Sequence, residues 1–246
     1  WTPLYLRPDS PGPESKFVCR LPRGGTLIVF PNIVSEKQQR RVEEELLECT
    51  YFRQYTCQNN PEPRAHFLLH NEATEKLEDP QPGYRYGITR MKARPLARLP
   101  YVKRLARSMQ QLCETVLKIP TDSGTFWTVG VNVVLYRDGR DQIGFHSDND
   151  QGEQVILTAI VSSPSGTSRR IAIRESESKA KLQNGCEFEL LLGAGDAYLM
   201  DGREGKFGTN FISRMFQVKC NNIMFIVCRA IKRQSLMTTI QTHYDV

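Results

Sequence analysis

The sequence predicts an α+β fold in which two amphipathic helices buttress one face of a double-sheet jelly roll. Helical periodicity is confined to two segments that end before residue 120, and from Trp127 onward the pattern changes to about eight short runs rich in Val and Ile. Helices followed by a series of short, glycine-punctuated strands are typical of this arrangement. We expect three parts: an extended proline-rich arm over 1–24, a jelly-roll domain over 25–233 and a tail over 234–246.

The first elements have clear local signals. Five prolines in residues 1–24 favour an extended arm, and 25–32 (GTLIVFPN) reads as a short buried strand. Ser35 and Gln38 form a capping-box pattern, which predicts that a helix begins there. Three apolar residues share one face of that helix: Val42, Leu46 and Cys49.

The middle of the chain is expected to be loop-rich until a second helix. Prolines interrupt residues 52–95, where only 84–87 (YRYG) reads as a short strand. A second helix is predicted over 96–119, broken or started near Pro100, with Val102, Leu105, Met109, Leu112 and Val116 on its packed face. Its opposite face carries three cations that are either solvated or in contact with phosphate: Lys103, Arg104 and Arg107.

The strands of the second half are predicted from their composition. They cover 128–136, 154–163, 169–176, 188–195, 196–200 and 221–231. No stretch approaches the 18 or so unbroken apolar residues of a membrane helix, so no membrane partner is expected.

Charge and cysteine content bear on partners and compartment. The 33 Lys and Arg residues exceed the 27 Asp and Glu residues, giving a net charge of +6. Nucleic acid is the first candidate for an acidic partner, and a solvated basic surface is the alternative. Seven cysteines without zinc spacing predict reduced thiols and an intracellular location. The chain begins at Trp1, which would fit removal of a targeting peptide such as a mitochondrial one.

One short motif points to metal chemistry. His146 and Asp148 lie two residues apart on an extended segment, so their side chains point to the same side. An imidazole and a carboxylate form two thirds of the ligand set of non-heme Fe(II) oxygenases, which a second histidine completes. The remaining histidines are not placed where such a fold needs that ligand: His66, His70 and His243.

The order of several motifs resembles the AlkB family of Fe(II)- and 2-oxoglutarate-dependent dioxygenases over about residues 25–231. These motifs are Pro63-Arg64, Tyr84-x-Tyr86, Tyr136 with Gly139, His146 and Asp148, the strand 169–174, Gly195-Asp196 with Met200, and 223–229. The resemblance implies a double-stranded β-helix, the jelly roll already predicted, with Fe(II) and 2-oxoglutarate as cofactors.

The same resemblance indicates a depleted site. It makes His146 and Asp148 metal ligands, but the third ligand falls near 209–211, where Asn210 is only a weak candidate. Tyr136 and Arg229 match cosubstrate-binding positions. Val134 replaces an asparagine and Ile223 replaces the arginine that would fork onto the distal carboxylate of 2-oxoglutarate. We therefore expect that Fe(II) and 2-oxoglutarate are not bound.

Nucleic-acid contacts are predicted at two clusters and one acid. The lid region supplies Arg64, Arg85 and Arg90, and a later strand supplies Arg169 and Arg170. Arg169 is alternatively an inward-pointing structural residue. Asp150 matches a family position near the target base, or else is a solvated acid in a turn.

Two hypotheses of different class follow. The first is an AlkB-like domain without dioxygenase activity that serves as a nucleic-acid-binding or scaffold module in a ribonucleoprotein assembly, with RNA favoured over DNA and with protein partners. The second is an active oxidative demethylase of nucleic acid. A third, less favoured, is an enzyme that acts on protein or uses another small reductant.

Overall fold

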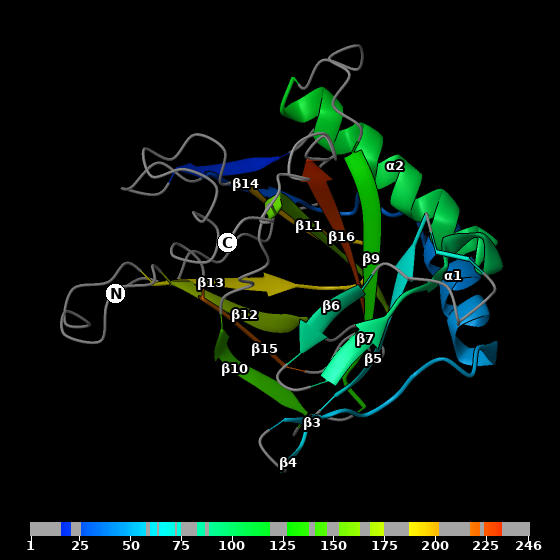
Figure 1. Ribbon diagram of the computed structural model, residues 1–246. Helices are drawn as coiled ribbons and strands as arrows, with labels where there is room; N and C mark the ends of the chain where they lie inside the picture. Colours follow the sequence, from blue (N-terminus) through cyan, green and yellow to red (C-terminus); the bar gives the residue numbers. More distant parts are fainter. Residues whose placement is uncertain are drawn as a thin grey trace, which may run out of the picture.

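The protein is built in three layers, with two helices, a large sheet and a small sheet in that order (Figure 1). The computed structural model describes residues 16–20, 26–57, 60–62, 64–71, 73–74, 83–86, 89–118, 127–137, 141–146, 153–162, 168–174, 187–201, 217–221 and 224–232.

The large sheet has eight strands, ordered β1-β2-β14-β11-β16-β9-β5-β8. Their bounds are β1 Phe17–Arg20, β2 Thr26–Phe30, β14 Ala197–Asp201, β11 Glu153–Ser162, β16 Met224–Lys232, β9 Trp127–Leu135, β5 Ala65–His70 and β8 Arg94–Pro95. Neighbours are antiparallel except β5 and β8, which are parallel.

The small sheet has four antiparallel strands in the order β10-β15-β12-β13. They are β10 Gln142–His146, β15 Gln217–Asn221, β12 Arg169–Arg174 and β13 Glu187–Leu192. From β9 to β16 the chain passes repeatedly between the two sheets, which makes a double-stranded β-helix. The predicted jelly roll is confirmed.

Both predicted helices are confirmed. α1 spans Glu36–Glu48, with Ser35 as its N-cap and the capping box to Gln38 formed. A 3-10 turn over Leu96–Arg98 (η1) precedes α2, Pro100–Val116, which therefore begins at the proline, where a missing N–H costs no helical hydrogen bond.

The core lies between the helices and the large sheet. Val42 and Leu46 of α1 and Val102, Leu105 and Met109 of α2 pack on one face of that sheet. The sheet residues on this side are apolar: Ile28, Phe30, Phe67, Leu69, Val131, Val133, Val155, Leu157, Ala159, Val161, Ala197 and Leu199. No helix in the described ranges is long and apolar enough to cross a membrane.

Two segments differ from the prediction. Phe17–Arg20, within the predicted arm, is an edge strand paired with β2. Ala65–His70, within the predicted loop-rich segment, is a wholly buried strand of the large sheet. A strand buried on both faces shows no alternation of polar and apolar residues, and its two histidines disguise it further.

Short strands complete the segment before α2. β3 (Thr56–Cys57) pairs with β4 (Asn60–Pro61), and β6 (Gly83–Tyr86) pairs with β7 (Thr89–Lys92) as a hairpin. Met91 of β7 packs against Leu68 of β5. This contact joins the β6–β7 hairpin to the sheet face that the helices do not cover.

Candidate functional site

The inner face of the large sheet, away from the helices, carries buried polar side chains. Side chains alternate along a strand, so residues that alternate with the helix-facing set point toward the small sheet. On this inner face lie His66, His70, Asn132, Thr158 and Tyr198, each no more than 8% exposed. The outer face of the same strands is apolar, so the polar groups of the interior are concentrated on the side that the jelly roll encloses.

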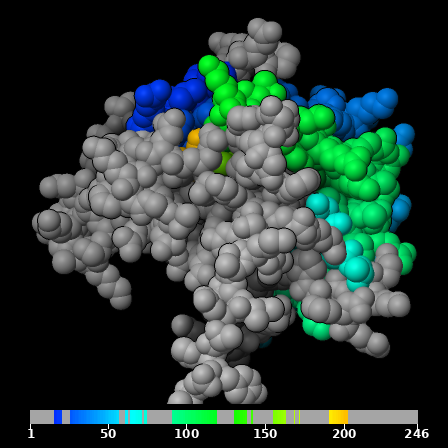
Figure 2. Space-filling view, turned by 45° about the horizontal axis from the view of Figure 1, so that its top comes forward, coloured from blue at the N-terminus to red at the C-terminus, as the bar shows by residue number. Residues whose placement is uncertain are grey.

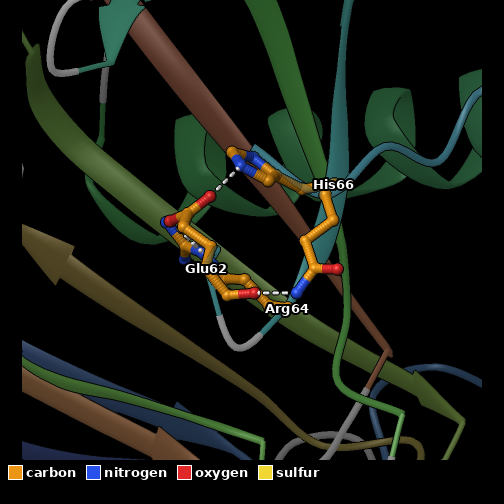
Figure 3. A network of polar contacts seen from close by, with 4 residues as sticks. Glu62, Arg64 and His66 are labelled. Atoms are coloured by element: carbon orange, nitrogen blue, oxygen red, sulfur yellow. Dashed lines mark hydrogen bonds and ion pairs between the residues drawn. The ribbon is translucent and has the colours of Figure 1, made fainter. Parts of the chain in front are cut away.

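Glu62 is the centre of a buried network at one end of β5 (Figure 3). Its Oε2 lies 2.7 Å from Nε2 of His66, and its Oε1 accepts from Nε of Arg64 at 3.2 Å. The side chains of all three are no more than 9% exposed. One carboxylate therefore holds both a guanidinium and an imidazole inside the protein, where such contacts are much stronger than in water.

The backbone around this network is also held in place. Glu62 donates its N–H to the carbonyl of Tyr55 at 2.8 Å, and Gln54 donates a side-chain N–H to the carbonyl of Glu62. The ring of Tyr55 meets that of His66 edge-on at 4.8 Å. Burial raises the pKa of Tyr55, against the lowering effect of Arg53 and Arg94, so its hydroxyl stays protonated beyond its usual range.

Backbone register joins the Glu62 network to the position expected to hold the cosubstrate. His66 of β5 is the direct cross-strand partner of Val134 of β9, and both are buried. Val134 has no hydrogen-bonding group on its side chain, and its neighbour on the same face is an imidazole bound to a carboxylate. Val134 therefore supplies no hydrogen-bond donor at the position where the resemblance implies an asparagine.

Tyr136 and Arg229, the predicted cosubstrate residues, lie at different register positions of the large sheet. Tyr136 is buried, one residue beyond β9. Arg229 of β16 is the partner of Gly130 and of Ile156, so its register position is six residues along β9 from Tyr136, about 20 Å at strand spacing. Gly130, the partner of Arg229, is also the cross-strand partner of His70 of β5.

Of the predicted metal ligands, the structure describes His146, which lies at the end of a described range. His146 ends β10, where Val218 of β15 is its partner. Asp141 directs the chain into β10, because its carboxylate accepts from the backbone N–H and the Nε of Arg137 at 2.8 and 3.0 Å. Asp148 and Asn210, like Asp150 and Ile223, lie outside the described residues. Within the described ranges, no three His, Cys, Asp or Glu side chains form a group that could hold a metal ion.

The hairpin brings two of the predicted nucleic-acid residues together. Arg85 of β6 and Arg90 of β7 are direct cross-strand partners. The register thus brings two of the residues predicted to contact phosphate to the same position of the hairpin.

The other predicted contacts lie beside β5 and on β12. Arg64 is only 7% exposed and is held by Glu62, so it does not offer the surface cation that the prediction requires. Arg169 and Arg170 lie on β12, where the register pairs them with Leu192 and Leu191 of β13.

Sequence reasoning missed the polar inner face. Glu62, His66 and Asn132 were not singled out, although Glu62 and His66 lie four residues apart with Arg64 between them. On a strand this spacing would place the three side chains on one face, but the sequence predicts a loop-rich segment there.

The family is established by comparison with known proteins. Residues 26–207 match the model of the 2OG-Fe(II) oxygenase superfamily, so the chain belongs to that superfamily. No curated protein sequence is similar enough to be matched to it.

Two solved structures show the shared fold. A prolyl hydroxylase from Trichoplax adhaerens, in complex with a hypoxia inducible factor oxygen degradation domain peptide, is 10% identical with a TM-score of 0.50, and the match covers 87% of each chain. An oxidoreductase of the 2OG-Fe(II) oxygenase family from Burkholderia pseudomallei is 9% identical with a TM-score of 0.50, over 85% of this chain and 86% of that one. At this identity the likeness establishes the fold alone.

Proposed function

We propose that this protein is an AlkB-like member of the 2OG-Fe(II) oxygenase superfamily that has lost dioxygenase activity and binds nucleic acid, with RNA favoured. The observation that carries the loss of activity is the pairing of Val134 with His66 on the inner face, with Glu62 bound to that imidazole. A dicarboxylate bound there would face an apolar side chain in place of an amide donor.

The binding half of the proposal is supported by charge. The net charge of +6 attracts polyanions at long range, and the cross-strand pair Arg85 and Arg90 provides a local basic point. Guanidinium groups match phosphate oxygens as forks, so two arginines at one register position suit contact with a phosphate.

The loss of activity is tested by anaerobic titration of the whole chain with Fe(II) and 2-oxoglutarate. We expect no metal-to-ligand charge-transfer band in the visible range, whereas an active superfamily member treated in parallel develops one. A band that forms in the wild-type chain and disappears in His146→Ala would overturn the proposal and favour the oxidative demethylase.

The binding half is tested with a labelled oligoribonucleotide. Affinity should fall as salt rises, with a log–log slope of about −0.7 for each phosphate contacted. Replacing Arg85 and Arg90 together by alanine should weaken binding more than the same change at Lys16 and Arg20, two exposed cations of the β1 segment. Absence of binding at about 50 mM salt would refute the proposal that the protein binds nucleic acid.

A further inference from the structure

A basic groove runs between α1 and α2 on the outside of the molecule, on the opposite side of the large sheet from the inner face. It encloses about 370 Å³. Val42 and Leu105, both buried, form its floor, and Lys37, Arg41 and Arg104 line it. Figure 2 shows side chains of α1 (blue) and α2 (green) side by side at the surface on this part of the molecule.

A tyrosine holds two of these cations in place. The guanidinium carbon of Arg104 lies 4.5 Å from the centroid of the Tyr101 ring, and that of Arg41 lies 5.8 Å from it. Both distances are within the range of a cation–π interaction. Two guanidinium groups, one from each helix, are therefore ordered around one ring, and this lowers the entropy that a bound anion would otherwise cost.

The position of Tyr101 is itself determined by a contact between the helices. Glu45 of α1 accepts hydrogen bonds from the backbone N–H groups of Tyr101 and Val102 at 3.1 and 2.8 Å. This carboxylate is thus engaged by the N-terminus of α2, where it also offsets the positive end of the helix dipole.

The charge of the groove is positive and weakly compensated. Of the described residues that line it, three are cations and none is acidic. Glu44 lies 3.8 Å from Arg41, but both side chains are more than half exposed, so that pair contributes little. Lys103 and Arg107 extend the positive charge along α2.

We propose that this α1–α2 groove binds the phosphodiester backbone of single-stranded nucleic acid, as a second contact surface separate from the β6–β7 hairpin. The proposal rests on the proposed function for the class of partner. Paired guanidinium groups suit phosphate oxygens better than isolated carboxylates spaced along a peptide, and the further cations on α2 suit an extended polyanion.

The test measures the anisotropy of a labelled polyuridylate of about 20 nucleotides with the whole chain. Arg41→Glu combined with Arg104→Glu should weaken binding about tenfold or more and reduce the salt slope by about 1.4, for two lost contacts. The matched control, Lys16→Glu combined with Arg20→Glu, has the same change in net charge away from the groove and should lose much less. Circular dichroism and thermal unfolding establish that both variants are folded.

Each other outcome overturns the inference in a distinguishable way. If the control loses as much affinity as the groove variant, the effect is one of net charge. If the wild-type chain binds and only the Arg85 and Arg90 variant weakens, the proposed function survives and the groove does not. If the wild-type chain binds no polyuridylate, the groove and the nucleic-acid-binding half of the proposed function both fail. If polyglutamate displaces the RNA from the groove at equal concentration of charge, the groove is a site for acidic peptides.

Discussion

Single buried residues set the polar character of the interior of this protein. Val134 presents no polar atom where the AlkB resemblance calls for an amide, and the buried network of Glu62, Arg64 and His66 stands beside it. Glu62 has two charged or polar partners in the same buried space, so its carboxylate is compensated. The network serves packing and hydrogen bonding within the fold.

Glu62→Ala should lower the free energy of unfolding by about 3–5 kcal/mol, because it removes the carboxylate that holds Arg64 and His66 in a buried environment. Chemical denaturation followed by circular dichroism measures this. Glu44→Ala is the matched control: it breaks the exposed pair with Arg41 and should cost less than about 0.5 kcal/mol. Equal losses in the two variants would show that the buried network contributes nothing special.

The thiol of Cys49 should ionise later in the folded chain than in the unfolded one. Burial raises its pKa, a backbone hydrogen bond with Tyr51 lowers it, and the negative charge of Glu45 raises it further. Above the ordinary thiol pKa the unfolded chain has lost this proton while the folded chain retains it, so this residue's contribution to stability falls as pH rises.

Alkylation of Cys49 by iodoacetamide, followed across pH by peptide mapping, measures the prediction. The pH at which alkylation is half-maximal should be higher in the native chain than in the denatured chain. The denatured chain is the control. A native midpoint at or below the denatured one would contradict it.

At the scale of elements, contacts between distant segments stabilise helix ends and turns for which the local sequence supplies no capping residue. The N-cap of α2 is Leu99, which makes no side-chain capping bond, and Glu45 of α1 caps the helix from outside. Gly195, with φ of +95°, turns the chain between β13 and β14, where a Cβ would lie 2.7 Å from Nε2 of Gln39. The glycine-aspartate motif is thus structural, since the Asp196 carboxylate accepts from the N–H groups of Asn32 and Gly193.

Glu45→Ala should cost about 1–2 kcal/mol of stability and loosen the first turn of α2, because two backbone N–H groups lose their acceptor. Hydrogen exchange at Tyr101 and Val102 measures the local effect and urea unfolding measures the total. Gln110→Ala removes a side-chain bond to Glu114 later in α2 and is the control. Unchanged exchange at Tyr101 and Val102 would refute the capping role.

At the scale of the whole molecule, the two faces of the large sheet differ in polarity. One face of the large sheet is an apolar layer under the helices, and the other carries His66, Asn132 and Thr158 in the interior. The α1–α2 groove and the β6–β7 hairpin lie on opposite sides of the large sheet. A long polyanion that contacted both would therefore pass around the edge of that sheet. The net charge of +6 favours such a partner at long range.

The sequence alone determined the fold class, both helices and half of the strands in the described part of the chain, because periodicity and capping are local properties. Ser35 with Gln38 predicted the start of α1, Pro100 that of α2, and the Val- and Ile-rich runs predicted most of β9–β16. It also placed Val134 at the position where the AlkB resemblance implies an asparagine, which needs only the order of motifs.

The tertiary structure alone decided which residues meet. It paired His66 with Val134, buried Arg64 against Glu62, set Arg85 opposite Arg90 and joined Arg41 and Arg104 around Tyr101. These contacts depend on register and on packing between segments up to 68 residues apart, as for His66 and Val134. No local pattern of residues encodes them, because strand partners and helix crossings are selected by the burial of the whole chain.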